Sequence, residues 1–222
     1  AVFREFASIY KPKNVIYLYF EGNDLDGLEW EKRDKNLIKY LKKGHNINYI
    51  KRLKEINSFL DSVEKESIQY AKVKTDNDLF KTKNKFNLYF EHFQDLVELN
   101  ITKNILRNTF LSKTTNYDLD LLYRIIKEMD NETKSWGGEF TFVYIPTWER
   151  YFHKYTNLNP VITLKDEIIF KLQSVNVEVI DLSEFFEKSN NLKENYPLGY
   201  IGHFSKIGYK NIANIIEKKV KK

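Results

Sequence analysis

Cysteine is absent from the sequence, which excludes disulfides, thiolate metal sites and a cysteine nucleophile. Glycine is scarce, with 8 residues, and it never recurs in the GxGxxG spacing of a phosphate-binding loop. No apolar run reaches the roughly 18 residues that a membrane-spanning helix needs. The histidines stand far apart, without the spacing of metal ligands. The sequence therefore predicts no cofactor, no metal site and no membrane span.

The first residues also lack a signal-peptide pattern. The chain opens with Ala1, and VFREFASIY at 2–10 is typical of the middle or end of an amphipathic helix. We therefore expect further residues upstream of Ala1, which leaves the compartment open, a periplasmic or extracytoplasmic location included. A length of 222 residues suits one domain with a full core, or a domain that carries a large insertion.

Positive charge is in slight excess, with a net charge of +5. An excess of this sign favours an anionic partner, such as nucleic acid or a polyanionic glycan. Lysines, however, alternate with Glu and Asp along most of the chain, and only EKKVKK at 217–222 forms a basic cluster. The many Lys, Asn and Ile residues also fit the codon usage of an AT-rich genome. We therefore do not expect a nucleic-acid-binding protein, and the oligomeric state stays open.

Apolar runs typical of strands lie at 15–20, 140–147 and 175–182. The first run is apolar throughout, which predicts a strand buried on both faces of a parallel sheet. Segments with helical spacing of apolar residues alternate with these runs along the chain, at 117–129, 163–175 and 207–220. Thr163 is placed to cap the second of these helices. The alternation predicts a three-layer α/β/α fold with a doubly wound, flavodoxin-like parallel sheet and right-handed crossovers.

Residues 28–115 interrupt this alternation with helical patterns. The segment 47–68 places one apolar stripe along a helix, formed by Ile50, Leu53, Ile56, Leu60 and Val63. We interpret 28–115 as a helical insertion between two strands, not a separate domain, that forms a lid, a substrate wall or an oligomer contact. Within it, 72–85 has the weakest pattern and is expected to be the least ordered stretch.

Two short stretches carry the chemistry: EGND at 21–24, directly after the first strand, and GYIGHFSKIGY at 199–209, before the last helix. Ligands of doubly wound sheets bind outside the carboxyl ends of the strands, where EGND falls. Together the two stretches resemble the SGNH (GDSL) hydrolases. The resemblance implies that Asn23 stabilises the oxyanion with Gly22 beside it, and that His203 is the general base. It covers two of the family's four sequence blocks, and about two-thirds of the chain in strand order.

The nucleophilic serine of that family is not found, because the chain has no Gly-Asp-Ser block. Asp61-Ser62 lies inside a helical pattern, and Ser8 lies on the opening helix, where we expect it to be half-buried. The resemblance thus implies a single SGNH-like domain over 1–222 that lacks its first strand, with the serine and a backbone N–H donor upstream of Ala1.

The acidic partner of His203 also departs from the family pattern, because Tyr200 occupies the usual Asp position. Three alternatives stay open: a Ser–His dyad oriented by a backbone carbonyl, an acid from Glu194, or an acid from Asp181. Asp181 is the weaker candidate, since an Asp at a strand end commonly caps the following turn. For the same reason we assign Asp24 a structural role within its loop.

The chemistry of ester hydrolysis explains why an asparagine and a histidine are needed. A side-chain amide donor such as Asn23 stabilises the tetrahedral oxyanion, an effect of about 3 kcal/mol per donor. A histidine with a pKa near 6.5 accepts the serine proton and returns it to the leaving alkoxide. We therefore expect an acyl or acetyl ester substrate, either a small molecule or a glycan, the glycan by family analogy alone. The alternatives are an O-acetyltransferase, a non-catalytic binding or assembly module, and a flavodoxin-like nucleotide or nucleic-acid binder.

Overall fold

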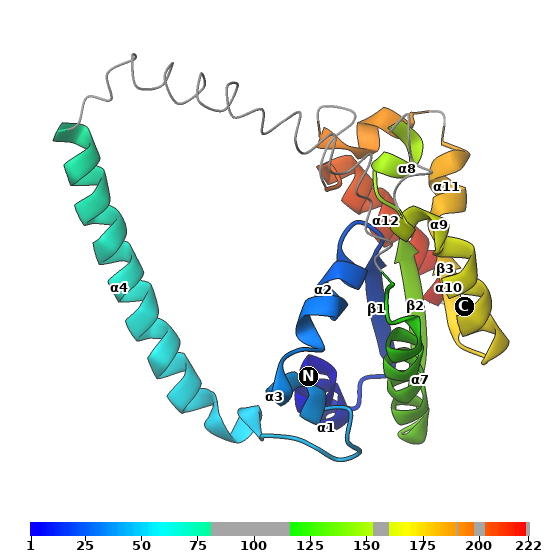
Figure 1. Cartoon of the computed structure of the whole chain (residues 1–222), viewed down its shortest axis with the longest axis horizontal. Coiled ribbons are helices and arrows are strands. Elements are labelled where there is room, and N and C mark those ends of the chain that lie inside the picture. The colour runs from blue at the N-terminus through cyan, green and yellow to red at the C-terminus, as the bar shows by residue number, and fades with distance from the viewer. Residues whose placement is uncertain (81–115, 153–159, 190, 198–202, 221–222) are drawn as a thin grey trace. The chain divides into compact units, whose positions relative to one another are not determined.

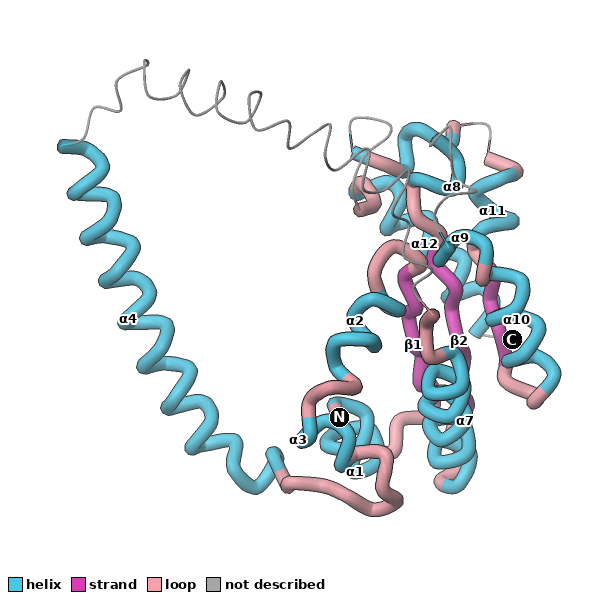
Figure 2. Tube along the Cα trace, viewed as in Figure 1, coloured by secondary structure: helices cyan, strands magenta, loops and turns pink. Residues whose placement is uncertain are grey.

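The computed structural model describes residues 1–80, 116–152, 160–189, 191–197 and 203–220. Its sheet consists of β1 (Asn14–Phe20), β2 (Glu139–Ile145) and β3 (Glu178–Asp181), all parallel and in that spatial order (Figures 1 and 2). The three predicted strands are confirmed, and the protein is a mixed α/β protein with a parallel sheet. Leu18, Val143 and Ile180 form one row across it.

Helices cover both faces of the sheet, because β2 is apolar on both sides. Its alternate residues Phe142 and Val143 are fully buried in two different clusters. The first cluster packs against α7 (Leu119–Ser135) and α10 (Lys165–Ser174) through residues such as Ile126 and Leu172. The second packs against α11 (Ser183–Glu187), η4 (Leu192–Asn195) and α12 (Lys206–Val220).

The strand β1 differs from β2, and its predicted burial on both faces is wrong within the described structure. Tyr19 is fully buried in the first cluster, with Val15 and Tyr17 packed beside it. On the opposite face Ile16 and Leu18 are 40% and 53% exposed. The reason is position: within the described residues β1 is an edge strand, paired with β2 alone, and the second cluster reaches β1 at Phe20 and does not include Ile16 or Leu18.

Helix boundaries follow local capping chemistry. The predicted opening helix is confirmed as η1 (Phe3–Ala7) and α1 (Ser8–Tyr10). The helical pattern after β1 is divided into α2 (Asp24–Glu31) and α3 (Lys35–Lys39), because the carboxylate of Asp34 accepts the N–H groups of Asn36 and Leu37.

The predicted cap at Thr163 is wrong. Thr163 ends α9 (Pro160–Thr163), which follows α8 (Glu149–Phe152), and Leu164 occupies the N-cap position of α10 without a side-chain cap. The turn of α9 therefore leads into α10 with Leu164 alone between them. The helix α10 nevertheless buries Ile168 and Leu172 with Leu164 packed beside them, as its spacing predicts.

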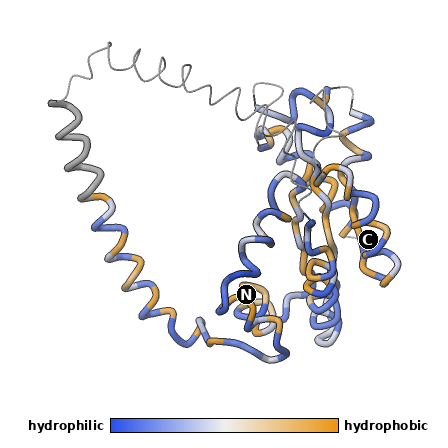
Figure 3. Tube along the Cα trace, viewed as in Figure 1, coloured by the Kyte–Doolittle hydropathy of each residue, from blue (hydrophilic) through white to orange (hydrophobic). Residues whose placement is uncertain are grey.

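Residues 47–113 form a compact unit distinct from 1–46 and 114–222. Its described part contains η2 (Tyr49–Arg52) and α4 (Leu53–Phe80), so residues 72–80 of the segment expected to be least ordered are helical. Hydrophobic residues recur along α4 (Figure 3), and Leu60 of the predicted stripe is 54% exposed. The helical pattern at 85–110 lies outside the described residues, and the insertion stays a prediction. No described helix is long and apolar enough to cross a membrane.

Candidate functional site

The EGND turn begins where β1 leaves the sheet. The N–H of Glu21 still donates to the carbonyl of Ile145, at 2.9 Å, whereas Gly22 and Asn23 are exposed. Asn23 is the N-cap residue of α2, yet its side chain makes no cap hydrogen bond, nor any other within the described structure. Its amide group is therefore accessible to a ligand at the carboxyl end of the sheet.

Gly22 makes room for the aromatic ring of Phe20. A Cβ at Gly22 would overlap Cε1 of that ring and would lie 2.8 Å from its Cζ. His203 and Phe204 also contact this ring, at centroid distances of 5.2 and 6.4 Å. A side chain at position 22 would thus displace the ring that His203 contacts.

The stretch around His203 is held in place by the two residues that follow it, Phe204 and Ser205. Phe204 is buried in the second cluster and stacks on Phe186, with ring centroids 5.3 Å apart. Ser205 caps α12, because its hydroxyl accepts the N–H of Gly208 at 3.1 Å and donates to the carbonyl of Glu194 at 2.5 Å. His203 itself is exposed, and its ring faces Phe20.

The structure therefore brings the two predicted stretches to the same end of β1. Phe20, the last residue of the strand, contacts the ring of His203, and Asn23 follows three residues later. The two stretches are about 180 residues apart in the sequence, so this neighbourhood is a property of the fold.

No described acidic side chain is hydrogen-bonded to His203. Asp181 instead accepts the N–H and the hydroxyl of Ser183, at 2.8 and 2.7 Å, which is the turn-capping role expected for it. Glu194 meets this region through its backbone carbonyl, and Tyr200 lies outside the described residues.

The two serines considered in the sequence, Ser8 and Ser62, have other partners. The hydroxyl of the half-buried Ser8 donates to Glu132, and that of Ser62 donates within α4 to the carbonyl of Phe59. Ser183 accepts from Lys165, at 3.0 Å, but this pair is not a nucleophile and base. Burial is the largest single effect on Lys165 and opposes its charge, but the hydrogen bond to Asp181 and the charges of Asp181 and Asp166 together raise its pKa, so the amine stays protonated.

Asp24 has the structural role expected for it. Its carboxylate accepts the N–H of Phe20 at 2.8 Å, on the side of β1 that faces away from β2. Burial raises the Asp24 pKa above its ordinary value, and the hydrogen bond from Phe20 only partly offsets that effect. The turn after β1 is thus closed by its own side chain.

Sequence reasoning missed the buried carboxylate of Glu21. It accepts hydrogen bonds from the Tyr144 hydroxyl at 2.6 Å and from the Thr147 N–H at 3.0 Å. Arg150 donates to it through Nε, at 3.1 Å to each oxygen, and through Nη2, and the same guanidinium reaches the carbonyl of Ile162 at 2.8 Å. A Glu directly after an apolar strand, followed by an Arg after the next strand, was the available signal.

This network fixes the loops at the carboxyl edge of the sheet. Burial and the neighbouring carboxylate raise the Tyr144 pKa, so the phenol donates throughout the physiological range. Burial opposes the Arg150 charge, but the hydrogen bond and charge of Glu21 raise the Arg150 pKa. The turn that carries Asn23 is therefore tied to the segment that follows β2.

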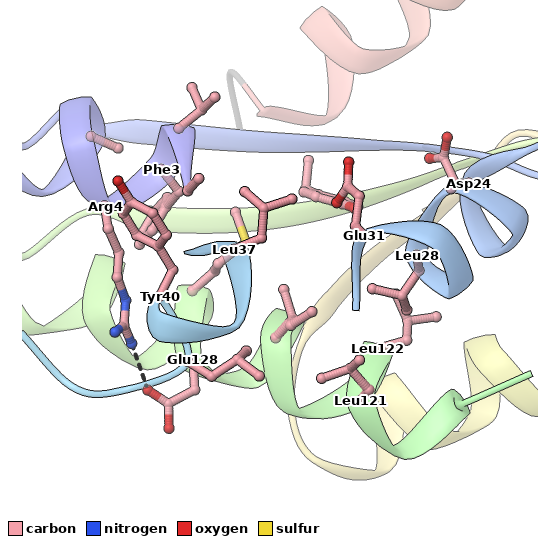
Figure 4. A pocket seen from close by; sticks show the side chains of 18 of the residues that line it. Phe3, Arg4, Asp24, Leu28, Glu31, Leu37, Tyr40, Leu121, Leu122 and Glu128 are labelled. Atoms are coloured by element: carbon pink, nitrogen blue, oxygen red, sulfur yellow. Dashed lines mark hydrogen bonds and ion pairs between the residues drawn. The ribbon is translucent and has the colours of Figure 1, made fainter. Parts of the chain in front are cut away.

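An apolar cavity of about 910 Å³ lies beside β1 (Figure 4). Its walls come from the opening helix, β1, α2, α3 and α7, with Val15, Tyr17, Leu28 and Leu122 among the lining side chains. Asp24 lies toward one end, and the ion pair of Arg4 with Glu128, at 3.2 Å, lies at the other. Asn23 is also among the lining residues, so the cavity extends to the EGND turn.

Groups of acidic or histidine side chains that could hold a metal ion are not found among the described residues. In comparisons of the chain with protein-family models, with curated proteins and with solved structures, nothing matches.

Proposed function

We propose that the protein is an SGNH-type hydrolase of an acyl or acetyl ester, with a three-layer, doubly wound fold of that family. Asn23 would stabilise the oxyanion, with Gly22 beside it, and His203 would be the general base. The observation that carries the proposal is the contact between Phe20 and His203. His203 contacts the last residue of β1, and the turn that follows this strand carries an Asn amide that has no partner within the described structure.

The reaction assigns each group one task. A serine hydroxyl attacks the ester carbonyl while the imidazole of His203 takes its proton, and the carbonyl electrons move onto the oxygen that the Asn23 amide holds. Collapse of this intermediate breaks the ester bond, and the leaving alkoxide receives the proton from His203. Water then repeats the sequence on the acyl-serine and releases the acid. The proposal expects the serine upstream of Ala1.

The test uses the natural full-length protein, a fluorophosphonate label and hydrolysis of p-nitrophenyl acetate. We expect a labelled serine, a loss of activity in His203→Ala, and a fall in kcat of about 10²- to 10³-fold in Asn23→Ala. His45→Ala is the matched control, because His45 packs on Tyr40 instead of Phe20. A folded protein that takes no label and shows no esterase activity would contradict the proposal.

A non-catalytic binding module is the second candidate, favoured because no described acid is hydrogen-bonded to His203. It predicts no esterase activity and no effect of His203→Ala on fluorophosphonate labelling. An O-acetyltransferase differs only in the acceptor, since a sugar hydroxyl replaces water in the second step. Transfer of the acetyl group to an added glycan, measured by mass spectrometry, would identify that activity.

A further inference from the structure

The helix α4 carries an apolar stripe that is open to solvent (Figure 3). Leu53, Leu60 and Val63 are 38%, 54% and 40% exposed. Phe59, which lies next to the stripe, is 65% exposed, and of the stripe residues on α4 Ile56 alone is partly sheltered. A helix in water draws most of its stability from the packing of its apolar face. The stripe of α4 therefore needs a partner.

The spacing of the stripe is that of a coiled coil. Its residues follow one another at steps of three, four and three positions, which is how the two core positions of a heptad repeat alternate. These core positions on α4 are occupied by Leu53, Ile56, Leu60 and Val63. A seam of this kind packs side chain by side chain against a second helix that carries a matching seam.

A second copy of the same stripe matches it when the two helices run antiparallel. With the two-fold axis at Ser58, Ile56 faces Leu60 of the second copy, because the two lie equally far from the axis. Leu53 faces Val63 of the second copy for the same reason. Every layer is then filled by one apolar side chain from each chain, which is the self-complementarity that a two-fold dimer requires.

The residues that flank the seam favour this antiparallel pairing over a parallel one. In the antiparallel pair Phe59 meets Phe59 of the second copy across the axis, and Arg52 lies beside Glu66 of the second copy. In a parallel pair Phe59 would lie beside the charged Glu64, and Arg52 beside Asn57. The antiparallel register thus joins opposite charges twice and brings the exposed aromatic rings together.

The side chain of Arg52 can make this contact and keep its partner within the helix. Its Nε and Nη2 donate to the carboxylate of Glu55, at 2.9 and 2.6 Å. A guanidinium has five N–H donors, so the others can reach Glu66 of the second copy.

We propose that α4 is a dimerisation helix, which pairs antiparallel with α4 of a second copy of this chain about Ser58. Apolar layers and charges select the same partner in the same register. The proposal selects the oligomer contact from among the roles considered for the insertion. It does not depend on ester hydrolysis.

Sedimentation equilibrium of the 222-residue chain tests the proposal. We expect a dimer with a dissociation constant on the order of 10 µM. Leu60→Asp places a charge in two apolar layers of the dimer and should weaken it by about 100-fold or more. Its matched control is Phe170→Asp on α10, which changes an apolar residue that is 73% exposed and should leave the dissociation constant unchanged.

A charge exchange tests the register. Arg52→Glu and Glu66→Arg should each weaken the dimer about tenfold, because each places like charges side by side. The double variant should restore it, since the opposite charges then meet again with their positions exchanged.

Cross-linking tests the orientation, and the chain suits it because it has no cysteine. In the antiparallel pair the two copies of position 57 lie side by side, whereas those of position 67 lie about 27 Å apart along the helices. A short bis-maleimide should therefore link two chains of Asn57→Cys and should not link two chains of Ser67→Cys.

Three results would overturn the proposal. A chain that stays monomeric at about 300 µM would show that residues of the same chain cover the stripe. A dimer that Leu60→Asp leaves intact would place the interface on another surface. Cross-linking at position 67 and not at 57, or a double variant that fails to restore the dimer, would exclude the antiparallel register.

Discussion

Removal of the Glu21 carboxylate should be among the most destabilising single changes in the chain. Glu21→Ala removes the carboxylate that pairs with the guanidinium of Arg150, whose side chain is 15% exposed, and leaves it the Ile162 carbonyl as an acceptor. It also removes the acceptor of the Tyr144 hydroxyl and of the Thr147 N–H. Breaking a buried ion pair on one side costs about 3–5 kcal/mol, and each orphaned polar group adds about 1–3 kcal/mol before relaxation. Relaxation of the site offsets part of this sum, so we expect a loss of about 4–5 kcal/mol.

Two further variants separate charge from shape. Glu21→Gln keeps an acceptor for Tyr144 but loses the charge, so a loss of about 2 kcal/mol is expected. The double variant Glu21→Leu with Arg150→Met replaces the pair by apolar groups. It should cost less than the sum of its single changes by about 2 kcal/mol or more, because neither charge is left buried alone.

Urea unfolding followed by tryptophan fluorescence measures these losses. All three tryptophans, Trp30, Trp136 and Trp148, lie in the unit formed by residues 1–46 and 114–222, so the signal reports on the sheet and its helices. A loss below about 1 kcal/mol for Glu21→Ala, or strictly additive effects in the double variant, would refute the reasoning.

Two other changes have expected signs. The folded-state pKa of Asp24 is raised above 3.8, so its favourable contribution is fully present below that pH and declines as pH rises through the folded pKa. Asp24→Asn keeps an acceptor for Phe20, and its unfolding free energy relative to wild type should therefore increase between about pH 3 and pH 7; a flat difference in urea titrations would contradict this. Gly208→Ala should destabilise by about 1–3 kcal/mol, because its Cβ would overlap the Asn195 carbonyl oxygen, whereas Gly27→Ala in open space should stabilise by about 0.5–1 kcal/mol. Equal signs for the two glycine variants would contradict that reasoning.

The strands and most helices were predictable because their signals are local. Five or more apolar residues within a short segment bounded by turn residues are enough to indicate 15–20 and 140–147 as strands. The division between α2 and α3 depends on one local carboxylate, Asp34, which the apolar spacing of 28–44 conceals. The break between the two helices can be predicted only if Asp34, as a helix N-cap residue, is given more weight than the periodicity of the apolar residues.

The candidate site was predictable only in part, for a physical reason. GND and the histidine stretch are short motifs, and only the folded structure shows that both lie at the same end of β1. Glu21 and Arg150 are 129 residues apart in the sequence. Taken alone, each is a charged residue of a type that is common on protein surfaces. The exposure of Leu18 was unpredictable as well, because an apolar run specifies what a strand needs to bury and not whether a neighbour is present.

The order of the strands along the chain also bears on how the molecule folds. About 120 residues separate β1 from β2, and about 30 separate β2 from β3. Closing the longer loop costs about 1 kcal/mol more conformational entropy than closing the shorter one. Pairing of β2 with β3, supported by α10 between them, should therefore precede the arrival of β1. The EGND turn, and the contact of Phe20 with His203, would then be completed in the last step of folding.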